Sequence, residues 1–377
     1  MSKIKKVCFL LVAHLPNDDR VWFHQAKCLK ENGFDVSIIS TITAHSDLEN
    51  SFCFNATGMK RTIVSRNISN ILNEIKPDII ICDNPLSVFY ASRFKKKYLN
   101  KTKLMMDVTE WYPSKKNLVN LNNFQRFIKK LILQCLNFYS GFLVDGFIFG
   151  EEFKAQFFKK YFKKKPYINL PYYPDLEYIR RNKLKDDFSV WHISYSGLLT
   201  KDKGFDNVLK AMRITALNNS NIQFTLSIIS NESFNDAQKS EINTMPENIE
   251  IQYHSYLPFE QFCKKIVHYD MFLDLREKDK ENNKCLPIKL FYYMACGCPV
   301  IFSDLDAIKM HIPEINEFAC TVNPNDEHEI SQHITEYIRI HEKYKNHAST
   351  ALEYAEKKYN WRVLSTHFLK FIEDAGH

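Results

Sequence analysis

The sequence predicts an α/β protein with two domains, each built on a parallel β-sheet whose strands alternate with helices. Its 377 residues, 45% of them apolar, exceed what one ordinary hydrophobic core accommodates. In both halves, short continuous apolar runs that suit strands buried on both faces alternate with stretches of helical period. We expect the first domain to span residues 1–170 together with a terminal helix over 360–377, and the second to span 190–359.

The composition narrows the class of protein. The ten cysteines form no C-x-x-C pair and no zinc-type spacing, which indicates a reducing cytoplasm and no structural metal. The apolar run Val7–Ala13 is short and has no cleavage-like site, so we expect no signal peptide. The longest apolar stretch, Leu131–Gly150, contains polar residues and turn formers, which favours a helix followed by a strand over a membrane span. We therefore expect a cytoplasmic protein, either soluble or peripheral on the inner face of the membrane.

The positive charge is concentrated in one part of the chain. The formal net charge is +7, but residues 91–185 hold 21 Lys and Arg against 7 Asp and Glu, a local charge of +14. Such a patch attracts polyanions or an acidic bilayer, although no nucleic-acid-binding module is present and we expect no nucleic-acid partner. Within it, Asn123–Phe138 has the pattern of a basic amphipathic helix that suits an acidic membrane surface. Solvated lysines and an ordinary packed helix are the alternatives.

The chain opens with a strand, a polar loop and a helix. Lys6–Val12 is the strand, and Val21–Glu31 is the helix, which Gly33 ends. The loop lacks the G-x-G-x-x-G fingerprint, so we do not expect a tightly bound NAD. Asp19 and Arg20 of this loop contact a ligand, brace the loop, or form a mutual pair on the surface.

A cluster of acidic and aromatic residues follows the fourth predicted strand. Pro77–Cys82 is the third strand and Leu104–Asp107 the fourth, and the latter leads into Thr109, Glu110 and Trp111. Carboxylates accept hydrogen bonds from sugar hydroxyls, and aromatic rings stack on the C–H faces of sugars. We expect a sugar site here. The alternative is that Asp107 and Glu110 only cap the next turn.

The second domain begins after a proline-rich link at residues 166–190. His192–Ser196 is its first strand, and Gly197 at the strand's end permits close approach of the backbone. Lys203 and Gly204 then stand immediately before a helix. A lysine beside the N-terminus of a helix is a cradle for phosphate, because the free N–H groups and the helix dipole both favour an anion.

The stretch Lys284–Ser303 has the pattern of a second ligand-binding corner. Pro287 stands where a first helical residue is expected, and Gly297 stands just past the helix, followed by a buried strand. The preceding strand is Met271–Leu275, so the polar loop between them lies at a strand's carboxyl end, where parallel sheets bind ligands. Lys289, in the first turn, adds a cation. An ordinary βαβ core unit without a ligand is the alternative.

This stretch resembles the donor-site helix of the family 4 glycosyltransferases, which use nucleotide sugars and have the GT-B fold. The family pattern is xLPxKxxEYMAxGxPVI, and the chain keeps Leu286, Pro287, Lys289, Tyr293, Met294, Ala295, Gly297, Pro299 and Val300. The two glutamates of the family's Glu-x7-Glu motif fall on Lys284 and Tyr292, so both acids are absent. The stretch from Gly197 to Gly204 likewise resembles the family's G-R-L-x-x-x-K-G, with Leu198 in place of the arginine.

The first domain carries a weaker resemblance to the same family. Its H-x-P-x-D-x-R-V pattern runs from His14 to Val21, in a loop that faces the cleft in that family. The family's D-x-H-E or D-x-T-E pattern, with W-Y-P after it, begins at Asp107. Thr109 stands where many members have a histidine, so a catalytic histidine is not carried over.

The resemblance implies two Rossmann-like domains that face across a cleft, with the C-terminal helix crossing back to the first domain. It implies a retaining, metal-independent glycosyltransferase of the hexosyltransferase class, without a cofactor, that moves a sugar from a nucleotide sugar to a glycan or lipid-linked acceptor. Bacterial surface-polysaccharide synthesis is the expected setting. We expect catalytic roles for Lys203, Lys289 and Glu110; donor contacts from Gly197, Lys203, Gly204, Leu286, Pro287, Lys289 and Tyr292; and acceptor-side contacts from His14, Asp19, Arg20, Asp107, Thr109, Glu110 and Trp111.

Two other functions remain open at this point. A nucleotide-sugar epimerase shares the fold and needs no acceptor. A non-catalytic relative that binds a glycan or a partner enzyme is favoured by the changes at Leu198, Lys284 and Tyr292.

Overall fold

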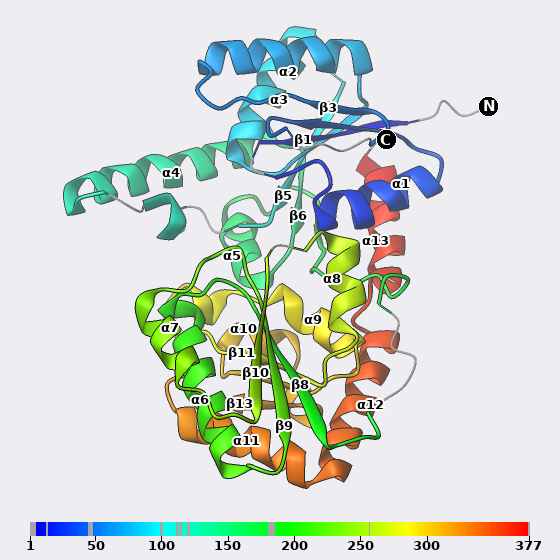
Figure 1. Cartoon of the computed structure of the whole chain (residues 1–377). Helices are drawn as coiled ribbons and strands as arrows, with labels where there is room; N and C mark the ends of the chain where they lie inside the picture. The colour runs from blue at the N-terminus through cyan, green and yellow to red at the C-terminus, as the bar shows by residue number, and fades with distance from the viewer. Residues whose placement is uncertain are drawn as a thin grey trace. The chain divides into compact units, whose positions relative to one another are not determined.

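The computed structural model describes residues 5–12, 14–43, 48–98, 101–110, 113, 115–118, 121–179, 185–255 and 257–375 (Figure 1). The chain divides into two compact units. Unit 1 comprises Met1–Tyr172 together with Leu364–His377, and unit 2 comprises Tyr173–Val363.

Unit 1 is built on a parallel sheet that has seven strands within the described residues, in the order β3-β2-β1-β4-β5-β6-β7. The strands are β1 (Lys6–Leu11), β2 (Asp35–Ser40), β3 (Ser51–Cys53), β4 (Ile79–Cys82), β5 (Lys103–Val108), β6 (Gly146–Phe149) and β7 (Tyr167–Asn169). The helical segments are η1 (Asp19–Ala26, a π-helix), α1 (Lys27–Glu31), α2 (Arg61–Ile75), α3 (Pro85–Tyr98), η2 (Lys115–Leu118), α4 (Asn123–Leu143) and α5 (Glu152–Tyr161).

The central strands of unit 1 are buried on both faces, as their continuous apolar sequences predict. β1 and β4 lie side by side in parallel, with Val7 beside Ile79 and Leu10 beside Cys82. The chain leaves β1 in one direction toward β2, while β4 lies on the other side of β1. The order of the strands therefore reverses between β1 and β4, and the loops that follow these two strands meet at one edge of the sheet.

Unit 2 contains a second parallel sheet, with six strands in its described part, in the order β10-β9-β8-β11-β12-β13. The strands are β8 (Val190–Ser196), β9 (Gln223–Ile229), β10 (Ile249–His254), β11 (Met271–Asp274), β12 (Val300–Ser303) and β13 (Ala319–Val322). The helical segments are η3 (Lys201–Lys203), α6 (Phe205–Asn218), α7 (Asp236–Asn243), α8 (Phe259–Ile266), η4 (Asn282–Lys284), α9 (Ile288–Ala295), α10 (Asp306–His311), η5 (Ile315–Glu317), α11 (Glu327–Arg339) and α12 (His341–Lys357). In this sheet the order reverses between β8 and β11.

Helix α9 ends as the sequence predicts. Gly297 takes a φ of 60°, its N–H donates to Met294 O (2.9 Å), and the next N–H donates to Tyr293 O (3.3 Å). This pair of bonds is a Schellman motif, which closes the last carbonyls of a helix and requires a left-handed residue that glycine adopts at low cost. The start differs slightly from the prediction, since Pro287 caps the helix and Ile288 is its first residue.

The fold class predicted from the sequence, two Rossmann-like α/β domains, is confirmed. Several elements were not predicted. The short strand β7 lies inside the stretch interpreted as a link, and β3, α7 and β13 are also additional. Helix α4 runs five residues beyond the predicted end at Phe138, to Leu143.

The last helix, α13 (Trp361–Ala375), contributes its residues from Leu364 onward to unit 1. No helix of the described part of the chain is both long enough and apolar enough to span a bilayer.

Candidate active site

The strand reversal in unit 2 lies between two connections that each carry one of the predicted lysines: Lys203 lies in the loop after β8, and Lys289 in the first turn of α9, after β11. β8 is followed by the loop to Gly204, and β11 by the loop to Pro287. The two strands are direct neighbours, with Leu273 beside Tyr195. Because ligands of open parallel sheets bind outside the carboxyl ends of the strands at such a reversal, this edge is the candidate donor site.

Lys203 and Lys289 each form a hydrogen bond to the segment that belongs to the other strand. Lys203, after β8, donates from Nζ to Asn282 Oδ1 in the loop after β11 (2.8 Å). Lys289, after β11, donates from Nζ to Ser196 O and Oγ at the end of β8 (both 2.9 Å). Lys203 is thus positioned by the loop after β11, and Lys289 by the last residue of β8.

Asn282 is the residue that orders the loop after β11. Its side chain is buried, and Nδ2 lies 3.0 Å from Glu277 O and 3.2 Å from Asp202 O. Its backbone N–H donates to Asp279 Oδ1 (2.9 Å). The polar loop is therefore held by its own hydrogen bonds, and these bonds place the oxygen that contacts Lys203. Sequence reasoning missed this residue.

Gly204 is required by the close approach of two backbones. Its φ is 70°, and a Cβ at this position would lie 1.5 Å from Leu275 O. Only glycine fits there, so the first turn of α6 lies directly against the end of β11. Gly197 is less constrained, because its Cβ would lie 3.2 Å from the Tyr195 hydroxyl.

The remaining predicted donor residues pack in the interior of unit 2 or cap a helix. Leu286 and Tyr292 are buried, and the Tyr292 ring packs edge-on against Phe259 and Phe262, with centroids 6.1 and 6.2 Å away. Pro287 caps α9. A direct contact between Tyr292 and a ribose stays a prediction.

A further cation that the sequence did not single out lies just after β11. Arg276 donates from Nε to Asp274 Oδ1 (2.7 Å) and from Nη2 to Asp274 Oδ2 (3.1 Å). Burial lowers the pKa of Arg276, but the charge of Asp274 outweighs it and raises the pKa above its ordinary value. The guanidinium therefore stays charged at the same edge of the sheet as Lys203 and Lys289.

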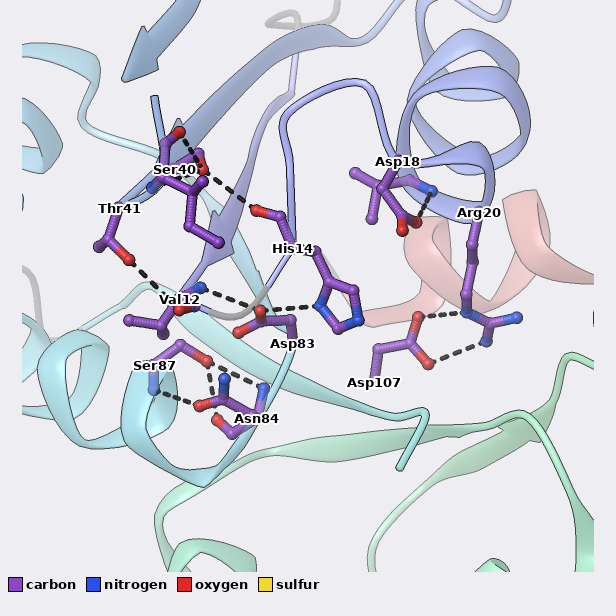
Figure 2. Close-up of polar contacts among 12 residues, drawn as sticks. Val12, His14, Asp18, Arg20, Ser40, Thr41, Asp83, Asn84, Ser87 and Asp107 are labelled. Carbon is purple, nitrogen blue, oxygen red and sulfur yellow. Dashed lines mark hydrogen bonds and ion pairs between the residues drawn. The ribbon is translucent and has the colours of Figure 1, made fainter. Parts of the chain in front are cut away.

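The strand reversal in unit 1 brings His14 and Asp83 together (Figure 2). His14 follows β1 and Asp83 follows β4, and His14 Nδ1 lies 3.0 Å from Asp83 Oδ2. The same carboxylate oxygen accepts the N–H of Val12 (2.9 Å). Sequence reasoning missed Asp83; the signal available was its position directly after a buried strand.

The carboxylates around His14 keep it protonated. Burial lowers the pKa of His14, but the hydrogen bond and charge of Asp83, with the charges of Asp18 and Glu110, raise it to about 9. Burial and the charge of Asp19 raise the pKa of Asp18 to about 6. At neutral pH this edge therefore presents an imidazolium flanked by carboxylates.

Arg20 and Asp107 form a buried brace beneath this edge. Arg20 Nε and Nη2 donate to the two oxygens of Asp107 (2.7 and 2.8 Å), and Nη1 donates to Leu170 O (2.7 Å). Gln25 Nε2 also donates to Asp107 Oδ2 (2.7 Å). The alternative of a surface pair between Asp19 and Arg20 is therefore wrong: Arg20 is only 4% exposed and pairs with Asp107, and Asp19 accepts its backbone N–H.

A polar pocket of about 230 Å³ opens beside His14. Its polar lining consists of His14, Asp83, Asn84, Asp107, Thr109, Glu110, Asn117 and Asn137. Glu110 is exposed, whereas Thr109 Oγ1 is buried and has no hydrogen-bond partner among the described residues. Amide, carboxylate and hydroxyl groups of this kind match the hydroxyls of a sugar. The predicted Trp111 lies outside the described residues.

The backbone carbonyl of Thr109 is held by the lysine of a buried ion pair. Lys154 Nζ contacts Glu151 Oε1 (2.7 Å) and donates to Thr109 O. Among the described residues, no group of three or more His, Cys, Asp or Glu side chains could hold a metal ion.

Comparison with known proteins agrees with this architecture. Residues 214–370 match a family described as glycosyl transferase-like. The solved structure of sucrose-phosphate synthase from Thermosynechococcus elongatus superposes with a TM-score of 0.71 at 12% identity, covering 98% of each chain. HepE from Anabaena, solved with UDP-glucose, gives 0.69 at 11% identity, covering 98% of this chain and 99% of HepE.

A third structure represents the alternative activity. A putative UDP-N-acetylglucosamine 2-epimerase from Listeria monocytogenes gives a TM-score of 0.66 at 11% identity, covering 98% of this chain and 96% of that one. A search of curated proteins found no match.

These findings establish the fold of the chain. The chain has the GT-B fold, as the sequence resemblance predicts. The match over residues 214–370 supports the glycosyltransferase class, consistent with the predicted group 1 type.

Proposed function

We propose that this chain is a retaining glycosyltransferase that binds the diphosphate of a nucleotide sugar at the β8–β11 edge of unit 2. The observation that carries the proposal is the reciprocal placement of Lys203 and Lys289: Lys203 is held by the loop after β11, and Lys289 by the last residue of β8. Two fixed ammonium groups at the edge where α6 begins suit a diphosphate, because the free N–H groups of a helix start add to the positive potential.

In this mechanism the lysines act on the leaving group. As the bond between the sugar and the nucleoside diphosphate breaks, negative charge grows on the phosphate oxygens, and the lysines stabilise it. The anomeric carbon gains oxocarbenium character at the same time. The proposal assigns the neutralisation of the diphosphate to protein cations, so it includes turnover without a divalent metal.

The acceptor is assigned to unit 1. The pocket beside His14 supplies hydrogen-bonding groups for a glycan or the sugar of a lipid-linked acceptor, with Glu110 as the acceptor-side group. HepE was solved in complex with UDP and with UDP-glucose, so uridine nucleotides are the first donors to test. Synthesis of a bacterial surface polysaccharide is the setting we propose.

The test is nucleotide release from a panel of UDP- and GDP-sugars, in the presence of chelator, with and without candidate acceptors. Lys203→Ala and Lys289→Ala should each lower turnover by about tenfold or more, the effect of losing a charged hydrogen-bond donor. Lys201→Ala is the matched control, since this exposed lysine lies in the same loop, and it should leave turnover unchanged. Unchanged turnover in both variants refutes the site assignment.

The same panel separates the two other functions. The structural similarity to the Listeria protein favours testing an epimerase, which would convert one sugar nucleotide into another and need no acceptor. A non-catalytic relative would bind nucleotide or glycan and convert no donor. Retention is read from the anomeric coupling constant of the product by NMR.

A further inference from the structure

The N-terminal half of α4 exposes an unusual number of large apolar side chains. Phe124 is 72% exposed, Phe127 60% and Ile132 54%, while Ile128 and Leu131 are exposed at 42% and 46%. In Figure 1 this half of the helix projects away from the strands of unit 1. A capping box between Asn122 and Gln125 fixes the helix start, so the exposed turns belong to a well-formed helix.

The C-terminal end of α4 is anchored by ring contacts, although Tyr139 and Phe142 there are themselves 54% and 59% exposed. Phe138 contacts Phe142 and Tyr161 edge-on, with centroids 5.2 and 5.3 Å away, and Tyr139 stacks on Phe89 at 5.7 Å. These contacts hold the helix against α3 and α5. The exposed apolar residues of the first half therefore have a rigid support.

Apolar and basic side chains occupy opposite sides of the exposed half. Phe124, Phe127, Ile128 and Leu131 follow the i, i+3, i+4, i+7 spacing of one helical face. Arg126, Lys129 and Lys130 are all exposed and, at about 100° per residue, fall on the opposite side. We call these two sets together the α4 surface. An apolar face with a basic face opposite it is the arrangement of a helix that lies in a membrane interface.

The ends of α3 and α5 lie near the C-terminal end of α4, where Lys95 contacts Asp145 and Tyr161 contacts Phe138, and they add positive charge there. Their exposed basic residues are Lys96, Lys97, Lys160, Lys163 and Lys164. Tyr98 and Tyr161 are also exposed, at 44% and 52%. Tyrosines with an apolar ring and a polar tip suit the headgroup region of a bilayer.

We propose that the α4 surface binds an anionic lipid bilayer, with its apolar face among the acyl chains and its basic residues at the headgroups. A second copy of the chain is a poorer occupant, because it would bring together two surfaces from a region of charge +14. An anionic bilayer supplies the opposite charge and an apolar phase together. The inference is independent of the proposed transferase activity.

Cys135 provides a direct probe of this docking. It lies on the apolar side of α4 and is the exposed cysteine among the ten, all of which lie in the described residues. The full chain, labelled at Cys135 with an environment-sensitive fluorophore, is mixed with vesicles of phosphatidylcholine alone or with phosphatidylglycerol. We expect a blue shift and co-sedimentation only with the acidic vesicles, weakened by salt.

Two sets of variants separate the apolar and electrostatic contributions. Neutralising Arg126, Lys129 and Lys130 to Gln should lower partitioning onto acidic vesicles about a hundredfold, at about fivefold for each basic residue. Phe127→Ser with Leu131→Ser should lower it more than tenfold. The matched control is Lys210→Gln with Leu217→Ser, an exposed basic and apolar pair on α6, which should have no effect.

The outcomes are distinguishable. An unchanged thermal melting curve shows that each variant folds, as expected for exposed positions. Equal binding to neutral and acidic vesicles, or variants of the α4 surface that bind like the α6 control, overturns the proposal. The proposal is also overturned if the parent chain binds no vesicles but dimerises with increasing concentration, and if the same variants abolish that dimerisation.

Discussion

Replacing Asp107 by Asn should destabilise unit 1 more than any surface charge change. In the folded unit, both oxygens of Asp107 accept hydrogen bonds from Arg20, and one also accepts from Gln25. An asparagine keeps one oxygen and turns the other position into a donor. In either orientation its amide nitrogen therefore faces another donor, and Arg20 loses its neutralising charge.

The expected magnitude follows from the burial of the pair. Arg20 and Asp107 have side chains only 4% and 5% exposed, so water cannot replace the lost partner. Removing one member of such a pair costs about 3–5 kcal/mol of the free energy of unfolding. Glu31→Gln is the matched control: its carboxylate lies 3.9 Å from Lys27 and is 61% exposed. A change of about 0.5 kcal/mol or less is expected there.

The measurement is urea unfolding monitored by circular dichroism, over a range of urea that unfolds both units. A double variant, Arg20→Met with Asp107→Asn, adds a second check, because removing the arginine frees the asparagine oxygen for Gln25. The double variant should therefore lose at least about 2 kcal/mol less than the sum of the two single variants. Additive losses, or an Asp107→Asn variant as stable as the Glu31→Gln control, refute the brace.

Two further predictions concern the edges of the two sheets. Gly204→Ala should destabilise unit 2 by about 2 kcal/mol or more, because it combines a left-handed conformation with a contact of 1.5 Å to Leu275 O; a melting temperature equal to that of the parent chain would contradict this. The raised pKa of His14 makes stability depend on pH. Since the folded pKa of about 9 exceeds the ordinary value of 6.5, the stabilisation is complete below pH 6.5 and is lost as the pH rises through about 9. The loss should amount to about 2–3 kcal/mol in unfolding titrations, and His14→Gln should abolish it. Asp18, whose pKa is raised from 3.8 to about 6, acts with the same sign at lower pH, so its contribution falls outside this window.

The elements of the fold could be predicted where local signals were strong. Continuous apolar runs such as Ile79–Cys82 identify buried strands, since parallel strands covered on both faces need no polar alternation. The Schellman ending of α9 follows from a single glycine. The short elements β3 and β7, three residues each, carry too little pattern to be recognised.

Only part of the candidate site could be predicted from the sequence. The sequence singled out Lys203 and Lys289, because a lysine beside a helix start has a local meaning, but it did not single out Asn282, which positions Lys203. It singled out His14 and left Asp83 unnoticed. For Arg20 it left open a ligand contact, a brace of the loop and a surface pair, and the structure shows a buried pair with Asp107.

By itself, therefore, the sequence determined the α/β class, the two-sheet organisation and the places of Lys203 and Lys289 after two strands, because these depend on residues close together in the chain. The tertiary structure decided which of these distant segments lie in contact. The pairs His14–Asp83, Lys203–Asn282 and Arg20–Asp107 are 69, 79 and 87 residues apart. Their contacts exist because strand order places β1 beside β4, β4 beside β5, and β8 beside β11. Strand order depends on packing between distant segments, and no local pattern encodes it.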